Sequence, residues 1–333
     1  MTPIDLQLVD LMAPMIKASN EAPSDFDSKS KINATLSKSE IIGNSFIFLF
    51  AGHETSANSI HFSIILLAIH LSSQARLQAD IDKIVGDKPT SELSYYTDMP
   101  RLYNSMVGAV MNEQLRLMPA ILNVPKVTAS DQLVTVDGRE FPISSGTFIQ
   151  LNVVATNRNP RYWPHSPSKR TGKSNDLDDF VPERWLSNTT LSNSQPNVDE
   201  KQEDVDGLEE ASYDTSTSGS LFKPVKNSFI SFSEGARACP GRRFAQVEIT
   251  AVLTAIFQKY SVELDVSEWA SDEEVARMGT AEKRAVYQKA MIRAESVLKR
   301  CEQRTITLQM RPGDKVPVRL VVRGKERFAG LMD

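Results

Sequence analysis

The stretch of sequence that decides the fold reads Phe232-Ser-Glu-Gly-Ala-Arg-Ala-Cys239-Pro240-Gly241, with an apolar run from Phe244 to Phe257 directly after it. The helical spacing of that run predicts a helix that begins at about Pro240, because proline suits the first helical position. Cys239 would then lie at the positive end of the helix dipole, which favours the thiolate over the thiol. Such a thiolate can bind a soft metal or act as a nucleophile. The plainer interpretation is a small buried cysteine near a turn.

The complete pattern of this stretch is Phe-x-x-Gly-x-Arg-x-Cys-x-Gly, formed by Phe232, Gly235, Arg237, Cys239 and Gly241. It resembles the haem-binding loop of the cytochrome P450 family, the haem-thiolate monooxygenases. The resemblance implies that Cys239 is the axial thiolate ligand of the iron in haem b. It also implies that Arg237 pairs with a haem propionate. Phe232 and the two glycines become cofactor-binding positions, since the glycines let backbone N–H groups approach the sulfur.

A long helix is predicted upstream of this loop. Ser37 and Glu40 form a capping box ahead of an apolar run, so a helix should begin there. No proline occurs from Glu40 to about His70, which permits a helix of about 45 Å at the standard rise. A transmembrane helix is the rival interpretation. Polar residues at the centre of the run favour a helix through a large protein core instead.

The centre of this helix reads Ala51-Gly-His-Glu54-Thr55-Ser56. Small residues followed by an acid and an alcohol suit either a helix-packing notch or an oxygen-activation site. The hexapeptide is similar to the Ala-Gly-x-Glu/Asp-Thr-Thr/Ser motif of the same family. The resemblance implies that Ala51 leaves room above the haem. It further implies that Glu54 and Thr55 are catalytic residues that relay protons to dioxygen.

Three more residues are assigned a structural role. Glu113 and Arg116 are three residues apart and share one helical face. Alone, the pair could equally be an exposed surface contact. The downstream segment Pro182-Glu-Arg184-Trp185 resembles the Pro-Glu-Arg-Phe segment of the family, with tryptophan in place of the usual phenylalanine. The resemblance implies a buried cluster of Glu113, Arg116 and Arg184 that supports the region beneath the haem loop.

Further segments complete the expected site and sheets. Lys126 lies where the family often has an arginine that contacts a haem propionate, so it is a cofactor-binding candidate. Residues 134–141 contain Asp-Gly between strand-like runs and predict a β-hairpin. Residues 305–310 and 316–322 flank a turn at 311–314 and predict a second hairpin.

The expected fold class is mainly α with small β-sheets, an α+β arrangement, in the cytochrome P450 fold. We expect a helix and linker over residues 1–35 and the haem-thiolate catalytic domain over 36–333. Insertions are expected at about 187–220, which is acidic and disordered by composition, and at 266–303, which is charged and helical. The N-terminal half of the family fold is expected to be missing, so this would be the C-terminal portion.

Composition narrows the function classes. The net charge of −4 gives no argument for nucleic-acid binding, and two cysteines cannot form a disulfide framework. We therefore expect an intracellular protein, and the resemblance places it at the surface of the endoplasmic reticulum membrane. No apolar stretch is long enough to span a bilayer, so no membrane anchor is expected within this chain.

The expected function is insertion of one oxygen atom from dioxygen into an apolar organic substrate. By resemblance, electrons come from an NADPH-dependent reductase. The long insertions are typical of filamentous-fungal members, many of which act in secondary metabolism. One alternative is a truncated haem-binding remnant without turnover. Another is a haem protein that isomerises peroxides or dehydrates its substrate.

Overall fold

The computed structural model describes residues 15–16, 36–186, 221–304 and 306–331. Within these ranges the chain is mainly helical, and its strands form small antiparallel sheets. The predicted fold class is thus confirmed. Apart from Met15 and Ile16, the helix and linker expected over residues 1–35 lie outside the described residues, as does the acidic insertion expected at 187–220.

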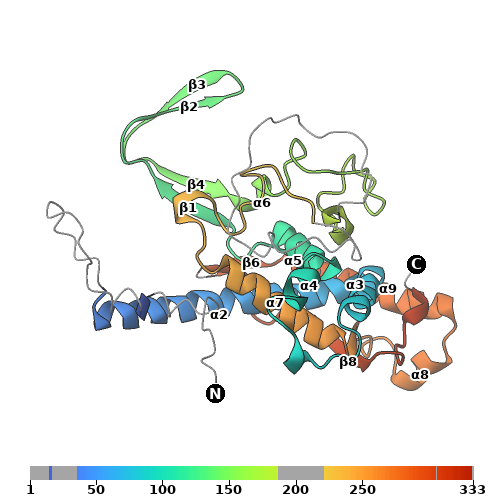
Figure 1. Cartoon of the computed structure of the whole chain (residues 1–333). Helices are drawn as coiled ribbons and strands as arrows, with labels where there is room; N and C mark the ends of the chain where they lie inside the picture. The colour runs from blue at the N-terminus through green and yellow to red at the C-terminus, as the bar shows by residue number, and fades with distance from the viewer. Residues whose placement is uncertain (1–14, 17–35, 187–220, 305, 332–333) are drawn as a thin grey trace, which may run out of the picture.

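Helix α2 (Lys38–Ile69) is the axis of the structure, and the other core helices lie along its C-terminal part (Figure 1). Its start follows from the predicted capping box. The Ser37 N–H donates to the Glu40 carboxylate at 2.7 Å, and the Ser37 hydroxyl accepts from the Glu40 N–H at 3.3 Å. Helix α3 (Leu71–Ile84) follows at a bend of 113°.

No helix within the described residues is by itself long and apolar enough to cross a membrane. Only α2 and α3 taken together meet the length and composition of a span, and the sharp bend lies between them.

The hydrophobic core surrounds helix α5 (Met106–Leu117), every residue of which is buried. Helices α2, α3, α4 (Asp98–Tyr103) and α7 (Arg242–Phe257) pack around it. Gly108 permits the close approach of α4 to α5, because a Cβ atom there would lie 1.8 Å from the Tyr103 carbonyl oxygen. The core therefore fixes the position of α5, the helix that carries Glu113 and Arg116.

Two small sheets project from the body of the molecule (Figure 1). Strand β1 (Asn123–Val127) pairs with β4 (Phe148–Asn152), and β2 (Gln132–Val136) pairs with β3 (Arg139–Ile143). The β2–β3 hairpin turns at Asp137 and Gly138, whose φ angles are 48° and 76°. Positive φ at both central residues is the type I′ geometry that Asp-Gly favours, so this prediction is confirmed.

The second predicted hairpin is wrong. The turn at residues 311–314 forms, with the Asp314 N–H donating to the Arg311 carbonyl at 3.0 Å. The strands on its two sides pair elsewhere: β7 (Thr307–Gln309) with β6 (Glu302–Arg304), and β8 (Val318–Val322) with β5 (Tyr260–Leu264). Strand β5 is the better partner for β8, because four of its five residues are buried and it offers five register pairs.

The segment 266–303 is helical, as predicted, and contains α8 (Asp272–Arg277) and α9 (Thr280–Lys299). Helix α6 (Val153–Thr156) follows β4. Short 3-10 helices complete the described elements: η1 (Thr90–Glu92), η2 (Pro182–Trp185), η4 (Gly235–Arg237) and η5 (Ala329–Leu331).

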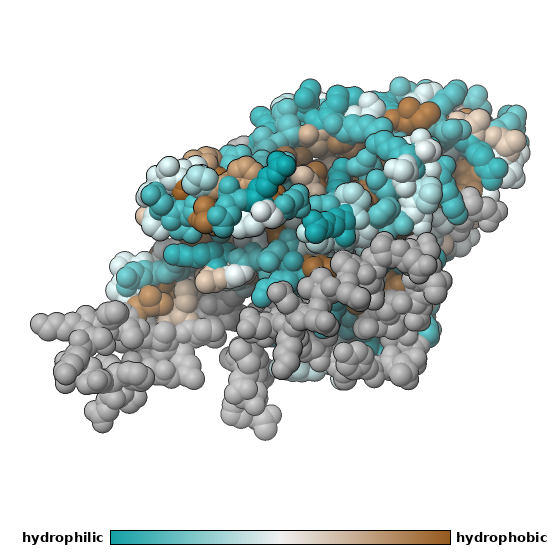
Figure 2. Space-filling view, turned by 90° about the horizontal axis from the view of Figure 1, so that it is seen from above, coloured by the Kyte–Doolittle hydropathy of each residue, from teal (hydrophilic) through white to brown (hydrophobic). Residues whose placement is uncertain are grey.

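The N-terminal half of α2 is apolar but lies open to solvent. Its exposed large side chains are Ile42, Phe46, Ile47, Leu49 and Phe50. The projecting strands add more exposed apolar side chains. Viewed from above, hydrophobic side chains lie among hydrophilic ones on this side of the molecule (Figure 2). Both halves of α2 are rich in apolar residues, but they differ in burial. The open half, residues 38–53, is largely exposed, whereas the core half, residues 54–69, contains all the buried residues of the helix.

Candidate haem site

The loop that carries Cys239 is closed by its own backbone. The Cys239 N–H donates to the Phe232 carbonyl at 2.8 Å, which joins the two ends of the loop. Inside it, the Ala238 N–H donates to the Gly235 carbonyl at 2.9 Å. Ser233 and Gly235 have φ angles of 60° and 74°, in the left-handed region that glycine adopts at little cost. These bonds hold the backbone on both sides of the cysteine.

Helix α7 begins at Arg242 with Gly241 as its N-cap, two residues later than predicted. Pro240 is therefore outside the helix and not at its first position, so that part of the prediction is wrong. The Arg242 N–H donates to the Cys239 carbonyl at 3.3 Å, and this turn joins the cysteine to the helix start. Cys239 still lies directly before the N-terminus of α7, where the helix dipole favours a negative charge.

The loop residues expected to contact the cofactor are exposed, and the phenylalanine at the start of the loop is half-buried. Cys239, Arg237 and Gly235 are exposed, whereas Phe232 is half-buried and packs against the hydrophobic core. The Arg242 guanidinium lies over the Phe232 ring, 5.7 Å from its centroid. No hydrogen bond or ion pair joins Arg237 to another residue of the described chain. The thiol and this guanidinium are therefore open to a ligand.

Ala51, Glu54 and Thr55 lie near the middle of α2. The Thr55 hydroxyl donates to the Ala51 carbonyl at 2.7 Å, a bond within the helix that is common for threonine. Ala51 is exposed, and Glu54 and Thr55 are half-buried. The motif therefore forms part of an uninterrupted helix in which Ser56 is buried, whereas a Cβ atom at Gly52 would meet no described atom within 4 Å, so no described helix packs closely at that glycine.

A polar network that the sequence did not reveal holds Glu54. The Gln309 side-chain amide on β7 donates to the Glu54 carboxylate and also to the Thr307 hydroxyl, the latter at 3.1 Å. Asn58, one turn after Glu54, donates to the same Thr307 hydroxyl at 3.2 Å. Thr307 and Gln309 are two residues apart and therefore share one face of strand β7. This alternation is the sequence signal that could have predicted that both side chains face α2. The network joins the expected proton-relay segment to the β6–β7 hairpin.

The residues near Cys239 suit a haem. Within the described residues, no group of three or more His, Cys, Asp or Glu side chains could hold a metal ion. Iron that a porphyrin already holds would need only one thiolate from the protein, so a haem requires no such group. The open Cys239 and Arg237 supply a soft ligand and a cation for an anionic edge. This donor set fits the cofactor that the sequence pattern predicts.

Glu113, Arg116 and Arg184 are brought together, and all three are buried. The Glu113 carboxylate accepts from Arg116 Nε at 2.8 Å and from Arg116 Nη2 at 2.9 Å, a bidentate pair. It also accepts from Arg184 Nε at 3.1 Å and from the Val181 N–H at 3.0 Å. The buried cluster predicted from sequence is present, and the exposed surface pair is excluded.

The Glu113 carboxylate pairs with two guanidiniums, and Asp176 supplies a second carboxylate, 3.2 Å from Arg184. Burial raises the pKa of the Glu113 carboxyl, but Arg116, Arg184 and the hydrogen bonds lower it to about 2 in sum. Beyond the carboxylate, Arg116 donates to the Leu177 carbonyl at 2.8 Å, and Arg184 donates to the Pro164 carbonyl at 2.7 Å. The two guanidiniums therefore tie together chain segments that are far apart in sequence.

Trp185 adds a contact that sequence reasoning missed. Its indole Nε1–H donates to the Glu113 carboxylate at 2.9 Å. The side chain is buried and packs edge-on against Trp163, with ring centroids 5.3 Å apart. A phenylalanine, the residue expected at this position, cannot make this hydrogen bond. The substitution noted in the sequence therefore gives Glu113 a further donor.

The segment before the Cys239 loop is tied to the end of α5. The Ser231 hydroxyl donates to the Leu115 carbonyl at 2.9 Å and accepts from the Asn157 side chain at 2.8 Å. The Asn157 side-chain oxygen in turn accepts from the Ile230 N–H at 3.0 Å. Because α5 carries the buried cluster, these bonds connect the cluster to the base of the loop.

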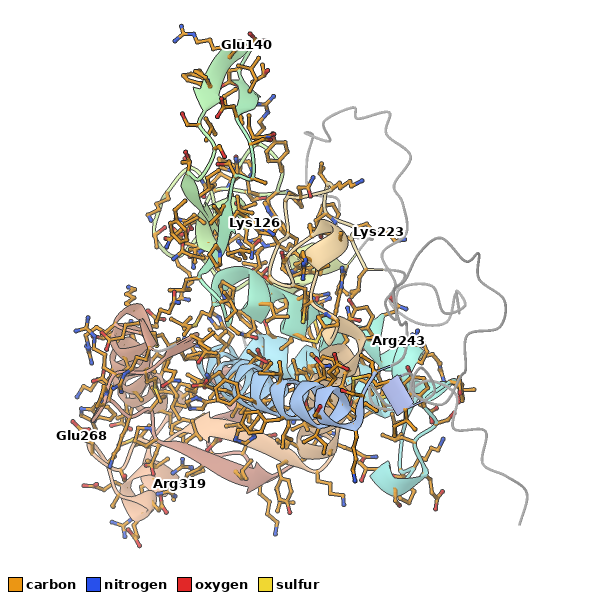
Figure 3. All side chains as sticks on the ribbon, turned by 90° about the vertical axis from the view of Figure 1, so that its left-hand side faces the viewer. Lys126, Glu140, Lys223, Arg243, Glu268 and Arg319 are labelled. Atoms are coloured by element: carbon orange, nitrogen blue, oxygen red, sulfur yellow. The ribbon has the colours of Figure 1, made fainter. Side chains whose placement is uncertain are left out.

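Lys126 is half-buried on β1, opposite Ile149 of β4. Figure 3 shows it on the projecting sheet, with Arg243 of the α7 start elsewhere on the molecule. No hydrogen bond joins Lys126 to the Cys239 loop among the described residues.

A mainly helical fold with small sheets, a buried Glu113 cluster and a cysteine loop before a core helix are the features that the sequence motifs predict for a haem-thiolate protein. The cytochrome P450 family model matches residues 6–288, and the chain belongs to this family. The match begins before residue 36, where the sequence motifs placed the start of the resemblance, and it ends within α9.

Curated relatives agree with this assignment. A cytochrome P450 monooxygenase of Arthrobotrys oligospora is 30% identical over 251 residues, which cover 74% of this chain and 39% of the relative. A cytochrome P450 monooxygenase of Postia placenta is 28% identical, with coverage of 77% and 39%. Cytochrome P450 3A13 of Mus musculus is 29% identical, with coverage of 77% and 40%. The chain thus spans about two fifths of the length of the curated relatives that it matches.

Proposed function

We propose that this chain forms the haem-binding and catalytic part of a monooxygenase that inserts one atom of dioxygen into an apolar organic substrate. The observation that carries the proposal is the Cys239 loop. Its backbone is closed by hydrogen bonds, while its thiol remains exposed at the start of α7. The monooxygenase names of the relatives support the same reaction class.

Each residue of the loop has a role in this proposal. Cys239 would hold the iron of haem b through its thiolate, and Arg237 would pair with a propionate. Gly235 and Gly241 keep side chains away from the sulfur, and the anchored Phe232 closes the loop. When bound, the haem supplies the oxygen chemistry, and the protein supplies ligation, orientation and proton delivery.

Two further positions complete the cofactor site in the proposal. Ala51 leaves space for the haem face on the exposed side of α2. Lys126 contacts a second haem propionate if the β1–β4 sheet approaches the Cys239 loop. The Lys126 ammonium would then act as a point charge, without the bidentate geometry of an arginine.

Glu54 and Thr55 deliver protons to dioxygen from one turn of α2. The Glu54 carboxylate can take a proton from solvent because it is half-buried and not sealed in the core. The Gln309 amide holds this carboxylate in place, and the Thr55 hydroxyl is oriented by the Ala51 carbonyl. Fixed geometry of this kind is what general acid catalysis requires.

The remaining assignments extend the same proposal. The partners are an apolar substrate, dioxygen and an NADPH-dependent reductase, at the surface of the endoplasmic reticulum membrane. Two of the relatives named as monooxygenases come from fungi, which supports a role in fungal secondary metabolism. The catalytic domain occupies residues 36–333, with 187–220 and 266–303 as insertions.

The test is a reduced carbon-monoxide difference spectrum of the full chain after haem loading. We expect the absorption band of a thiolate-ligated haem, and we expect Cys239→Ala to abolish it. Cys301→Ala is the matched control, since this half-buried thiol donates to the Val297 carbonyl and should leave the band unchanged. Absence of the thiolate band in the unmodified chain would refute the proposal.

Haem binding without turnover is the second candidate. The observation in its favour is the open apolar half of α2, because five large apolar side chains there have no covering wall within the described residues. Turnover separates the two candidates. With a reductase and NADPH present, the monooxygenase consumes dioxygen in a substrate-dependent way. A chain that shows the thiolate band but no such consumption is a binding protein.

A further inference from the structure

A cavity lies at the other end of the molecule from the open half of α2. It has a volume of about 530 Å³ and lies between α9 and the turn after β7. A second cavity of about 160 Å³ shares Trp269, Arg293 and Lys315 with the first. None of the residues proposed to bind haem lines either cavity. Figure 3 shows Glu268, on the wall of the smaller cavity, at the side of the molecule away from Arg243.

The larger cavity is lined by four cationic side chains and one carboxylate. The cations are Lys289, Arg293, Arg300 and Lys315, and the carboxylate is Asp314. Arg300 pairs with Asp314 at 3.0 Å, and Arg293 pairs with Glu268 of the smaller cavity. Lys289 and Lys315 have no ion pair or hydrogen bond to another residue of the described chain through their ammonium groups. Two positive charges are therefore left without a carboxylate.

Apolar surface lies beside these two lysines. Trp269 and the exposed Ile292 line the larger cavity. In the smaller cavity, Trp269 lies with apolar side chains from β5 and α9, namely Leu264, Ala290 and Ala294. A volume of this size falls within the range of small-molecule sites. The combination suits a ligand with one charged end and one apolar end.

We propose that this cavity binds an amphipathic organic anion, with its charged group at Lys289 and Lys315 and its apolar part against Trp269. An ammonium that binds a carboxylate, sulfate or phosphate oxygen makes a charge-assisted hydrogen bond. Removal of the apolar part from water adds a favourable contribution in proportion to the area covered. This site stands on residues apart from the haem loop, so it does not depend on the proposed function.

The test compares three ligands with similar alkyl chains and different polar ends: anionic octanoate, neutral 1-octanol and cationic octylammonium. The full chain is titrated with each by calorimetry, and tryptophan emission is followed in parallel. Of the three tryptophans, Trp163 and Trp185 are buried, so a change in emission reports mainly on Trp269. We expect saturable binding of octanoate and at least roughly tenfold weaker binding of octylammonium, because like charges repel.

Substitutions locate the binding site. Lys289→Ala and Lys315→Ala should each weaken octanoate binding by about twofold to fivefold, the upper range for loss of an exposed charged contact. Lys299→Ala is the matched control, because it removes the same charge from an exposed position on α9 outside the cavity. The affinity of the Lys299→Ala variant for octanoate should be unchanged.

Three results would overturn the proposal. The first is absence of saturable octanoate binding. The second is equal binding of octanoate and octylammonium, which would assign the signal to apolar surface such as the open half of α2. The third is an equal loss of affinity in Lys299→Ala and Lys289→Ala, which would mean that only net charge matters.

Discussion

The Glu113 cluster and the Cys239 loop are built in opposite ways. In the cluster, three charged side chains are buried and each is bonded to others. In the loop, the backbone is bonded while the thiol and Arg237 stay open to solvent. A buried, satisfied network determines one local structure. An open side chain on a fixed backbone can bind a ligand without local refolding.

This contrast separates the residues that stabilise the fold from the residues that are open to a ligand. Removal of a side chain from the cluster should destabilise the fold without affecting any ligand contact directly. Removal of the loop thiol should abolish ligation with little effect on stability. The predictions below test both sides, beginning with the largest change in the free energy of unfolding.

Glu113→Gln should have the largest effect. The substitution keeps the shape of the side chain but leaves the Arg116 guanidinium buried without a carboxylate partner, while Arg184 retains only Asp176 at 3.2 Å. We expect the free energy of unfolding to fall by about 3–5 kcal/mol, measured by urea denaturation. Glu140→Gln, at an exposed position on the β2–β3 hairpin, is the control and should change it by no more than about 0.5 kcal/mol. Similar losses in the two variants would show that the cluster does not hold the fold.

Acid should weaken the same cluster. The pKa of Glu113 in the folded chain is about 2, below its ordinary value of 4.5. The cluster therefore stabilises the fold fully above pH 4.5, and this contribution of about 3 kcal/mol is lost as the pH falls from 4.5 towards 2. Unfolding free energies measured across this range should fall more steeply for the unmodified chain than for Glu113→Gln. Parallel curves would contradict the assignment.

Trp185→Phe should cause a smaller loss. It removes the indole N–H that donates to the Glu113 carboxylate while keeping an aromatic ring in the core. A hydrogen bond to a charged group contributes about 1.5–3 kcal/mol, and we expect a loss in that range in urea denaturation. Trp163→Phe is the comparison, because the Trp163 indole donates at 3.1 Å to the uncharged carbonyl of Ser228, and phenylalanine keeps an aromatic ring beneath the Arg116 guanidinium. Its loss should be smaller, about 0.5–1.5 kcal/mol.

Cys239→Ala should have the smallest effect on stability. The thiol is exposed, and the loop is held by backbone bonds that alanine retains. Measured on the haem-free chain, the free energy of unfolding should change by no more than about 0.5 kcal/mol. A loss of several times this amount would mean that the cysteine supports the loop structurally, and the contrast with the cluster would then fail.

Local sequence signals predicted the elements that depend on short-range chemistry. The capping box at Ser37 and Glu40 marked the start of α2, because both partners lie within one turn. Asp137 and Gly138 marked the β2–β3 turn, because their positive φ angles are a property of those residue types. The cluster of Glu113, Arg116 and Arg184 was expected only through the family resemblance of two separate segments, because Glu113 and Arg116 alone could equally form an exposed pair.

Such local signals could not predict which strands and side chains pair when the partners are far apart in sequence. The strands around the turn at 311–314 were assigned to each other, whereas β8 pairs with β5 across the whole of α8 and α9. The bond from Gln309 to Glu54 and the bond from Trp185 to Glu113 were also missed. Each depends on a partner far away in sequence, and nothing in the local spacing specifies that partner.

The buried half of α2 has a consequence for synthesis on the ribosome. The Tyr287 hydroxyl donates to the Ala68 carbonyl at 2.6 Å, and these residues are 219 positions apart. At roughly 5–20 residues per second, about 10–40 s pass before Tyr287 has been added after Ala68. During this time the apolar C-terminal half of α2 has been translated without its final partners. The contacts between α2 and α9 therefore form only late in translation, whereas α3 and α5, which also pack against α2, are translated soon after it.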